Sequence, residues 1–274
     1  MARSSDKRRQ ENDALSRERA HHDTWASEID VAEIPVETYF EASTCPENRY
    51  IISKIGTVRG KRLLELGCGA GEGSVFFALR GAECTATDIS PGMVNTALAL
   101  AQRYGVHIQG RVMNAMAIDF PDGSFDLVYG ANVLHHVNAE AALREIHRVL
   151  KPGGKACLWD PLRHNPIINI YRRIAKDVRS ADEKPLDIHI VRFARGLYSH
   201  VEHDTFWFCT LWIFIRFYLI ERVDPNQERY WKKIITEETR LRPTYLRLEA
   251  IDRFLKMLPG IKRYAWNIAI IATK

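Results

Sequence analysis

The chain has 274 residues, of which 46% are hydrophobic, so it is long enough for one large domain with a sizeable core. Its five cysteines form no C-x-x-C pair, which argues against a zinc site and a disulfide framework, and we expect no metal. The charged first residues argue against a secretory signal, and a reducing cytoplasm is the expected compartment. The net charge of +5 arises outside residues 60–160 and is compatible with solvated helices, an anionic membrane, nucleic acid or an acidic substrate.

The first 30 residues carry charges of both signs and begin without apolar periodicity. We therefore expect residues 1–30 to be a partly flexible segment and residues 31–274 to form a single domain. Pro46 stands at a plausible first helical position and predicts a helix over residues 46–55.

A glycine loop between a strand and a helix is the most informative motif of the chain. Residues 63–74 read LLELGCGAGEGS, an apolar strand followed by glycines where the backbone turns tightly and approaches a ligand. Asp88 follows at the tip of a second strand, where doubly wound folds place the carboxylate that binds a ribose. The pattern predicts an adenosine-type ligand at the carboxyl ends of these strands.

The glycine spacing narrows the choice of ligand. Dinucleotide sites use G-x-G-x-x-G before a helix that faces a pyrophosphate, whereas this loop reads G-x-G-x-G. Glu65 stands two residues before the first glycine, where a carboxylate repels phosphate and suits a cationic amine. We therefore expect a ligand with a ribose and an amine but no phosphate.

Residues 60–160 resemble a class I SAM-dependent methyltransferase of the small-molecule type, similar to the quinone-biosynthesis methyltransferases. The resemblance rests on the glycine loop, Asp88, FDLVYGANVLHH at 125–136 and RVLKPGG at 148–154. It implies a Rossmann-like α/β fold, with a seven-stranded, mostly parallel sheet, an antiparallel last strand and helices on both faces. It also implies an N-terminal lid, a helical insertion after the fifth strand, and S-adenosylmethionine (SAM) as cofactor.

The resemblance also implies which residues contact the cofactor. Asn114 occupies a position where the family often has aspartate, and its side-chain carbonyl can still accept from an adenine amino group. The expected contacts are Glu65, Gly67, Cys68, Gly69, Gly71, Asp88, Ile89, Met93, Asn114, Ala115, Met116 and Asn132.

The loop after the predicted strand at 125–129 is expected to pass beside the methyl acceptor. It contains His135 and His136, and histidine accepts a proton near neutral pH, so either is a candidate base for a hydroxyl acceptor. We expect only one of the two to face the site. The alternative is that both are structural, because an amine or acidic carbon acceptor needs no strong base. A helix at 139–150 and a strand at 155–160 follow.

Four further residues are candidates for substrate contacts. Trp25 and Tyr39 belong to the N-terminal region that forms a lid in such methyltransferases, although large aromatic side chains also pack a lid onto its domain. Arg163 and His164 follow the fifth strand, where a substrate would approach.

The last third of the chain predicts a helix at 186–197, a sixth strand at 200–208, helices within 224–260 that break at Pro243, and a final buried strand at 265–274. Residues 206–220 contain a single charge, Arg216, but are too short to span a bilayer, which needs ~20 apolar residues. They are either a core strand that enters a buried helix, or a partly exposed apolar helix that contacts a bilayer or a lipid-like substrate.

The predicted function is methyl transfer from SAM to a small acceptor that is apolar or lipid-linked, with peripheral membrane contact and no nucleic-acid partner. Two alternatives stay open: an RNA-modifying enzyme that uses the basic flanks, and a SAM-fold binding subunit without catalysis. The sequence contains no appended RNA-binding motif, which favours the small molecule. Neither the methylated atom nor the oligomeric state follows from the sequence.

Overall fold

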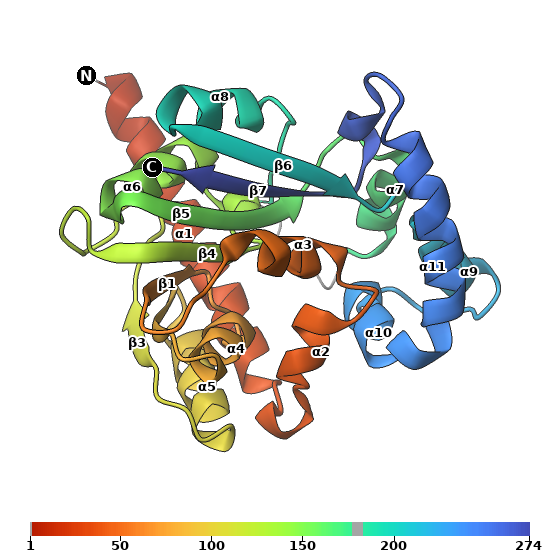
Figure 1. Ribbon diagram of the computed structural model, residues 1–274, viewed down its shortest axis with the longest axis horizontal. Helices are drawn as coiled ribbons and strands as arrows, with labels where there is room; N and C mark the ends of the chain where they lie inside the picture. The colour runs from red at the N-terminus through yellow and green to blue at the C-terminus, as the bar shows by residue number, and fades with distance from the viewer. Residues whose placement is uncertain (1, 177–182) are drawn as a thin grey trace.

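The computed structural model describes residues 2–176 and 183–274, with side chains described from Asp13 onward. Seven strands form one sheet in the order β3-β2-β1-β4-β5-β7-β6 (Figure 1). They are β1 (Arg62–Leu66), β2 (Glu83–Asp88), β3 (Gln109–Val112), β4 (Phe125–Ala131), β5 (Leu150–Pro161), β6 (His200–Phe206) and β7 (Asn267–Thr273). Strands β1 to β5 pair in parallel, whereas β7 is antiparallel to both β5 and β6, which confirms the predicted fold class.

Eleven helices are described around this sheet, together with four short 3₁₀ helices. The helices are α1 (Ala2–Ser27), α2 (Val36–Glu41), α3 (Pro46–Ile55), α4 (Glu72–Leu79), α5 (Pro91–Arg103), α6 (Ala139–Val149), α7 (Pro166–Ile174), α8 (Ile190–Leu197), α9 (Trp212–Leu219), α10 (Tyr230–Thr236) and α11 (Glu238–Leu255). The 3₁₀ helices are η1 (Val31–Glu33), η2 (Leu134–His136), η3 (Cys209–Leu211) and η4 (Ile261–Tyr264). No helix in the described ranges is long and apolar enough to cross a membrane.

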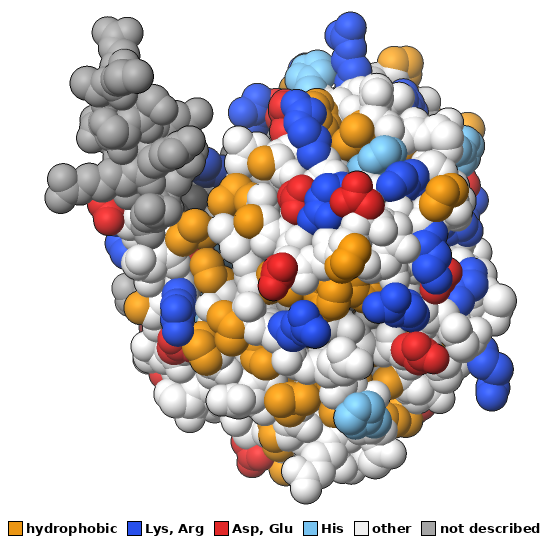
Figure 2. Space-filling view, turned by 90° about the vertical axis from the view of Figure 1, so that its left-hand side faces the viewer, with side chains coloured by type: hydrophobic (Ala, Val, Ile, Leu, Met, Phe, Trp, Pro, Cys, Tyr) orange, Lys and Arg blue, Asp and Glu red, His pale blue; other side chains and the backbone are white. Residues whose placement is uncertain are grey.

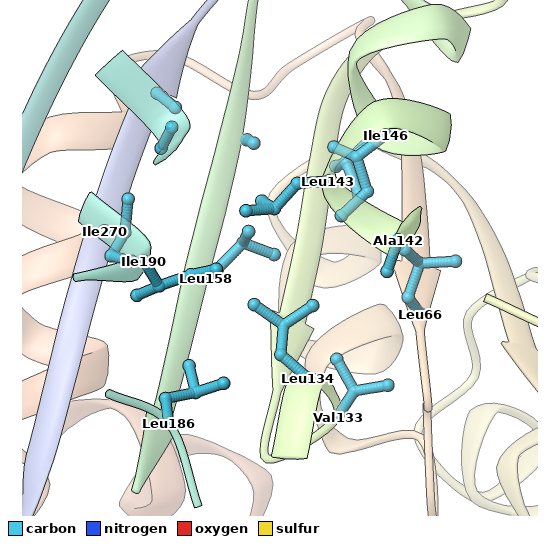
Figure 3. Close-up of a cluster of buried hydrophobic side chains, with 14 of the residues drawn as sticks. Leu66, Val133, Leu134, Ala142, Leu143, Ile146, Leu158, Leu186, Ile190 and Ile270 are labelled. Atoms are coloured by element: carbon cyan, nitrogen blue, oxygen red, sulfur yellow. The ribbon is translucent and has the colours of Figure 1, made fainter. Parts of the chain in front are cut away.

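Both faces of the sheet bury apolar side chains beneath helices. On one face, Leu158 of β5 and Ile270 of β7 pack against Leu143 and Ile146 of α6 and Ile190 of α8 (Figure 3). On the other face, helices α2 to α5 cover β1, β2, β4 and β7. Because parallel strands buried on both faces require apolar residues throughout, their continuous apolar runs predict this two-sided burial.

Side-chain caps start α5, α6 and α7, the last through Asn165 Oδ1, which accepts from the Ile168 N–H. Ser90 Oγ accepts from the Met93 N–H at the start of α5, and Asn138 Oδ1 accepts from the Ala141 N–H at the start of α6. Pro91 follows Ser90 at the first position of α5, where a missing N–H costs no hydrogen bond.

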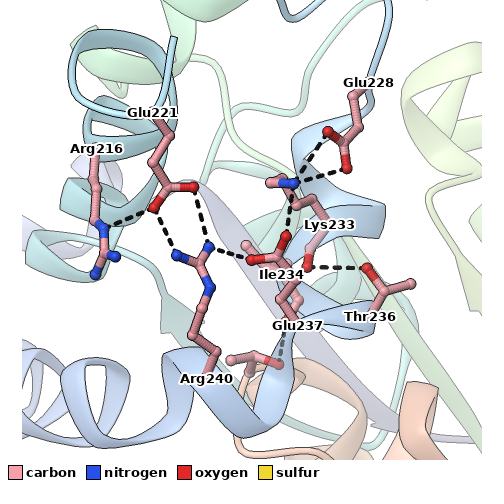
Figure 4. Close-up of polar contacts among 9 residues, drawn as sticks. Arg216, Glu221, Glu228, Lys233, Ile234, Thr236, Glu237 and Arg240 are labelled. Carbon is pink, nitrogen blue, oxygen red and sulfur yellow. Dashed lines mark hydrogen bonds and ion pairs between the residues drawn. The ribbon is translucent and has the colours of Figure 1, made fainter. Parts of the chain in front are cut away.

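Helices α9, α10 and α11 form a separate layer at one end of the sheet (Figure 1). Ion pairs connect the three helices: Glu221, after α9, contacts both Arg216 and Arg240, and Glu237 joins Arg240 to Lys233 of α10 (Figure 4). These ion pairs therefore link α9, α10 and α11 to one another.

The predicted break at Pro243 is wrong. The chain turns at Glu237, and Pro243 lies inside α11, where it removes one backbone hydrogen bond of the helix. Leu241 and Tyr245 are fully buried on either side of it, so tertiary packing holds the helix through the proline.

The apolar run at 206–220 combines features of both predicted alternatives. Trp207 and Phe214 are buried in the core, as the first alternative requires. Trp212 is 48% exposed, and Leu219 and Ile220 at the end of α9 are also exposed. Helix α9 therefore has one buried face and one apolar face in solvent.

Candidate active site

One large cavity of about 520 Å³ opens at the carboxyl ends of β1, β2, β4 and β5. Its walls come from the glycine loop, the loop after β4, helices α1 and α3, and helix α10 with Arg229 just before it. Most of the predicted site residues line this cavity: Trp25, Tyr39, Glu65, Gly67, Cys68, Gly69, Asp88, Ile89, Asn114, Ala115, Asn132, His135 and His136.

The glycine loop needs glycine at each of its three positions. Gly67, Gly69 and Gly71 have φ values of +60°, +51° and +89°, which side chains rarely allow. A Cβ on Gly67 would lie 2.8 Å from a methyl group of Val133, so glycine is required for the close approach of the loop to Val133. Gly71 is not in the cavity wall, and its Cβ would lie 2.5 Å from that of Ala97 in α5. Its function in the structure is therefore close helix packing.

Asp88 is held rigidly at the end of β2. Its Oδ2 accepts from the Gly69 N–H at 3.1 Å, and its Oδ1 accepts from the Ser90 N–H at 2.9 Å. Desolvation raises the pKa of this nearly buried carboxyl above its ordinary value. Each oxygen retains acceptor capacity toward the cavity, as a pair of ribose hydroxyls requires.

Glu65 lines the cavity, where its predicted cofactor contact stays a prediction, and it also has a structural role. Its Oε2 accepts from both the N–H and the hydroxyl of Ser74, at 2.6 and 2.5 Å, and thereby holds the first turn of α4. Desolvation raises the pKa of Glu65 to about 8. A Cβ on Gly73 would overlap its carboxylate, so this glycine is required by the glutamate beneath it.

Besides Gly71, two of the predicted cofactor contacts lie outside the cavity wall. Met93 is fully buried on the inner side of α5, and the sulfur of Met116 accepts from the Asn138 N–H at 3.3 Å. Asn114 does line the cavity, and its Oδ1 accepts from the Met116 N–H at 2.9 Å. That hydrogen bond orients the amide for the adenine contact that its sequence position predicts.

The two histidines of η2 both line the cavity, whereas we expected only one to do so. In a 3₁₀ turn three residues complete one revolution, so Leu134 points into the core while the next two side chains remain on the cavity side. The ring centroids of His135 and His136 are 4.0 Å apart.

Asp160, near the end of β5, holds the η2 turn in place through hydrogen bonds. It accepts from the backbone N–H groups of Leu134 and His135 at 3.2 and 3.1 Å, and its Oδ1 lies 2.8 Å from His135 Nδ1. Desolvation raises the pKa of Asp160 to about 7, against the opposing effect of these hydrogen bonds.

Helix α1 covers the cavity and contacts the second histidine through a group we name the lid cluster: Glu18, His22 and His136. Glu18 Oε1 lies 2.9 Å from His22 Nε2 and 2.8 Å from His136 Nδ1. The three ligand atoms lie within 4.8 Å of one another, a composition that can also bind a transition metal. We interpret the lid cluster as a polar contact that joins helix α1 to the η2 turn.

Two further contacts hold α1 over the cavity. Asp23 Oδ1 accepts from the Ser90 hydroxyl at 2.5 Å and from the Gly92 N–H at 3.1 Å, at the start of α5. Trp25 receives Arg229 over its ring at 4.1 Å. Trp25 therefore both packs the lid and lines the cavity, so the two interpretations of this residue are compatible.

Arg163 and His164 are not among the residues that line the cavity, and their substrate contact stays a prediction. Both pair with Asp187, and the His164 Nε2 to Asp187 Oδ2 distance is 3.1 Å. The preceding Leu162 is buried in the core and bridges to Leu186, next to Asp187, which brings these residues together.

Sequence reasoning missed the far end of the cavity, beside β5 and β7. Its wall contains Glu47, Asn48, Tyr129, Trp159, Trp207, Trp266 and Asn267. Glu47 follows Pro46, so it has the appearance of an ordinary first-turn acid of a helix. Asn267 provides the one available signal, because it is a polar residue in an otherwise apolar final strand.

Comparisons with known proteins agree with this geometry. Residues 64–158 match a family model described as a methyltransferase domain. The 27-O-demethylrifamycin SV methyltransferase of Amycolatopsis mediterranei is 32% identical over 153 residues, which are 54% of this chain and 53% of the relative. The chain spans about half the length, or less, of the curated relatives it matches.

Solved structures share the fold at low sequence identity. Phosphoethanolamine N-methyltransferase 2 of Haemonchus contortus, in complex with S-adenosyl-L-methionine, has a TM-score of 0.56 at 18% identity, covering 84% of this chain and 52% of that chain. A protein from a Haloferax volcanii complex with the Trm112 methyltransferase activator has a TM-score of 0.58 at 16% identity, covering 92% and 96%.

The wall of the cavity fits SAM. Its glycine loop and Asp88 line the cavity together, and Asp88 offers acceptors for ribose hydroxyls. Residues 64–158 carry a methyltransferase domain. The chain shares its fold with a solved methyltransferase structure that contains S-adenosyl-L-methionine.

Proposed function

We propose that this protein transfers the methyl group of SAM to a small-molecule acceptor with a largely apolar body. The supporting observation is that one cavity joins the glycine loop and Asp88 to a histidine pair and to a wall of tryptophans. The bound cofactor supplies an activated methyl group. The protein then has to orient the acceptor, exclude water and remove one proton.

His136 is the proposed base for a hydroxyl acceptor. Its Nδ1 contacts the Glu18 carboxylate at 2.8 Å, which favours a fixed ring orientation. Histidine is the side chain that most often acts as a general base in enzymes. His135 is bound to Asp160 and serves as a positioning residue for the turn.

A peripheral membrane contact is the second part of the proposal. Exposed apolar side chains lie along α9 and α11 and in the segment after them: Trp212, Tyr218, Leu219, Ile220, Leu246, Ile251, Phe254, Met257 and Leu258. We name this set the apolar face. Arg253, Lys262 and Arg263 are close to it in the sequence and would suit anionic headgroups. Such a contact places a cytoplasmic protein beside lipid-like acceptors.

The RNA-modifying alternative has less support. On the side of the molecule shown in Figure 2, Lys and Arg side chains are interspersed with acidic and hydrophobic ones rather than gathered into a stripe. A nucleic-acid surface is expected to concentrate positive charge along one face. The alternative of a binding subunit without catalysis predicts SAM binding but no turnover on any acceptor.

Calorimetry with SAM and S-adenosylhomocysteine tests the cofactor site. Asp88→Ala should weaken both ligands by roughly 10-fold to 150-fold, which corresponds to the 1.5–3 kcal/mol of hydrogen bonds to a charged group. Asp119→Ala is the matched control, because Asp119 is exposed and outside the cavity wall. Unchanged affinity in Asp88→Ala would contradict the assignment. A screen of acceptors with labelled SAM then identifies the substrate.

A further inference from the structure

A carboxylate is buried at the far end of the cavity, away from the glycine loop. Glu47, at the start of α3, is only 5% exposed and lines the cavity. The Asn267 Nδ2 donates to its Oε1 at 2.7 Å. The side chain of Trp207 lies close enough to the same carboxyl group to lower its pKa. Glu47 is therefore fixed in place by residues from β7 and from the end of β6.

Glu47 lacks a positive partner within the described part of the chain. No Lys, Arg or His there forms an ion pair with it, and Asn267 and Trp207 are both neutral. Buried charges in proteins are normally paired or bound to a cation, because desolvation of an isolated carboxylate is expensive. Burial accordingly raises the pKa of Glu47 to about 7. A cation from outside the chain would remove this penalty.

The position of its partner Asn267 in the sheet separates Glu47 from the glycine loop. Its partner Asn267 begins β7, which pairs with β5, whereas the glycine loop follows β1 on the other side of β4. A ligand group that reaches Glu47 therefore belongs to the acceptor end of the cavity.

The surroundings of Glu47 suit an organic cation. Trp159, Trp207, Trp266 and Tyr171 all line this end, and aromatic faces attract ammonium groups. The Oδ1 of Asn267 is buried without a hydrogen-bond partner in the described residues, so it offers a second acceptor beside the carboxylate. Trp207 has a φ of +70°, a conformation that bulky residues rarely adopt, and it places the indole against Glu47.

We propose that Glu47 and Asn267 form a subsite for a protonated amine, so that the methyl acceptor of this protein carries a basic nitrogen on an aromatic or apolar body. The carboxylate provides the charge, the Asn267 Oδ1 accepts a hydrogen bond, and the tryptophans enclose the cation. This inference rests on the proposed function, because it concerns the acceptor of the same cavity.

The test compares three probes of one size on protein saturated with S-adenosylhomocysteine: phenethylamine, 2-phenylethanol and 3-phenylpropionate. Dissociation constants come from ligand-observed NMR titrations. We expect the amine to bind about tenfold or more tightly than the alcohol, and the acid to bind weakest. Glu47→Gln should abolish the preference for the amine, whereas Glu28→Gln, an exposed carboxylate at the cavity mouth, should preserve it.

Equal binding of amine and alcohol by the wild type, or an unchanged amine preference in Glu47→Gln, would overturn the subsite. The affinity for S-adenosylhomocysteine is measured for each variant and reports separately on folding and on the cofactor site. If Glu47→Gln weakens that affinity as strongly as amine binding, Glu47 holds the cofactor's own ammonium and the inference is wrong. If the wild type does not bind S-adenosylhomocysteine at all, the proposed function fails instead.

Discussion

Replacing Glu47 by glutamine should stabilise the ligand-free protein at pH 8 and much less at pH 5.5. Desolvation in the folded state raises the pKa of this carboxyl from its ordinary value of 4.5 to about 7. Between these two values the unfolded chain loses the proton while the folded protein retains it. The free energy of unfolding of the wild type therefore decreases as pH rises through this window, and the loss is complete above pH 7. Glutamine has no proton to lose and avoids this loss.

The magnitude follows from the same pKa values. One pKa unit corresponds to about 1.36 kcal/mol, so the whole window costs about 3 kcal/mol, of which about 2 kcal/mol falls above pH 5.5. For a protein of this size, that smaller share is a difference of about 4–8 °C in Tm. Thermal unfolding of the wild type, Glu47→Gln and the control Glu28→Gln should be followed at pH 5.5 and pH 8.

The gap in Tm between Glu47→Gln and the wild type should widen from pH 5.5 to pH 8, whereas that of Glu28→Gln should remain constant. A gap of equal size at both pH values would show that the carboxyl titrates normally in the folded protein. In that case, burial does not raise the pKa of Glu47, and the carboxylate has no missing partner in the folded protein.

His136→Ala should lower kcat for a hydroxyl acceptor by a factor of about 10² to 10⁴ without changing SAM affinity, and full activity would exclude it as the base. A chelator such as EDTA should leave turnover unchanged if the lid cluster is a polar contact; a loss that Zn²⁺ restores would reveal a metal site instead. Gly73→Ala should reduce the free energy of unfolding by about 1–3 kcal/mol, because its Cβ would overlap a buried carboxylate. Gly196→Ala in α8, where a Cβ meets nothing within 4 Å, should raise it by about 0.5–1 kcal/mol, and equal effects in a denaturation assay would contradict the packing. Flotation with anionic liposomes at low salt should recover the protein, and Trp212→Glu should reduce the recovery while Leu79→Glu, exposed on α4, should not. Equal recovery of both variants would remove the apolar face as a membrane contact.

The glycine loop and Asp88, which form the predicted cofactor site, come from one short segment of the chain and can be recognised from the sequence. Gly67, Gly69 and Asp88 lie in one strand–loop–helix–strand unit, and their functions depend on backbone conformation and on the ends of adjacent strands. The apolar runs of the strands and the continuous final strand likewise predict a sheet buried on both faces, as the structure shows. These features are periodic or short-range, so the sequence expresses them directly.

The far end of the cavity was decided only by the tertiary structure. Glu18 of α1 meets His136, and Glu47 meets Asn267 some 220 positions later, through contacts that no local pattern predicts. Arg163 shows the converse, because it pairs with Asp187 and does not line the cavity that its sequence position suggests. The glycine loop and Asp88 belong to one supersecondary unit, whereas the far end of the cavity is assembled from segments that only the packing of the whole chain brings together.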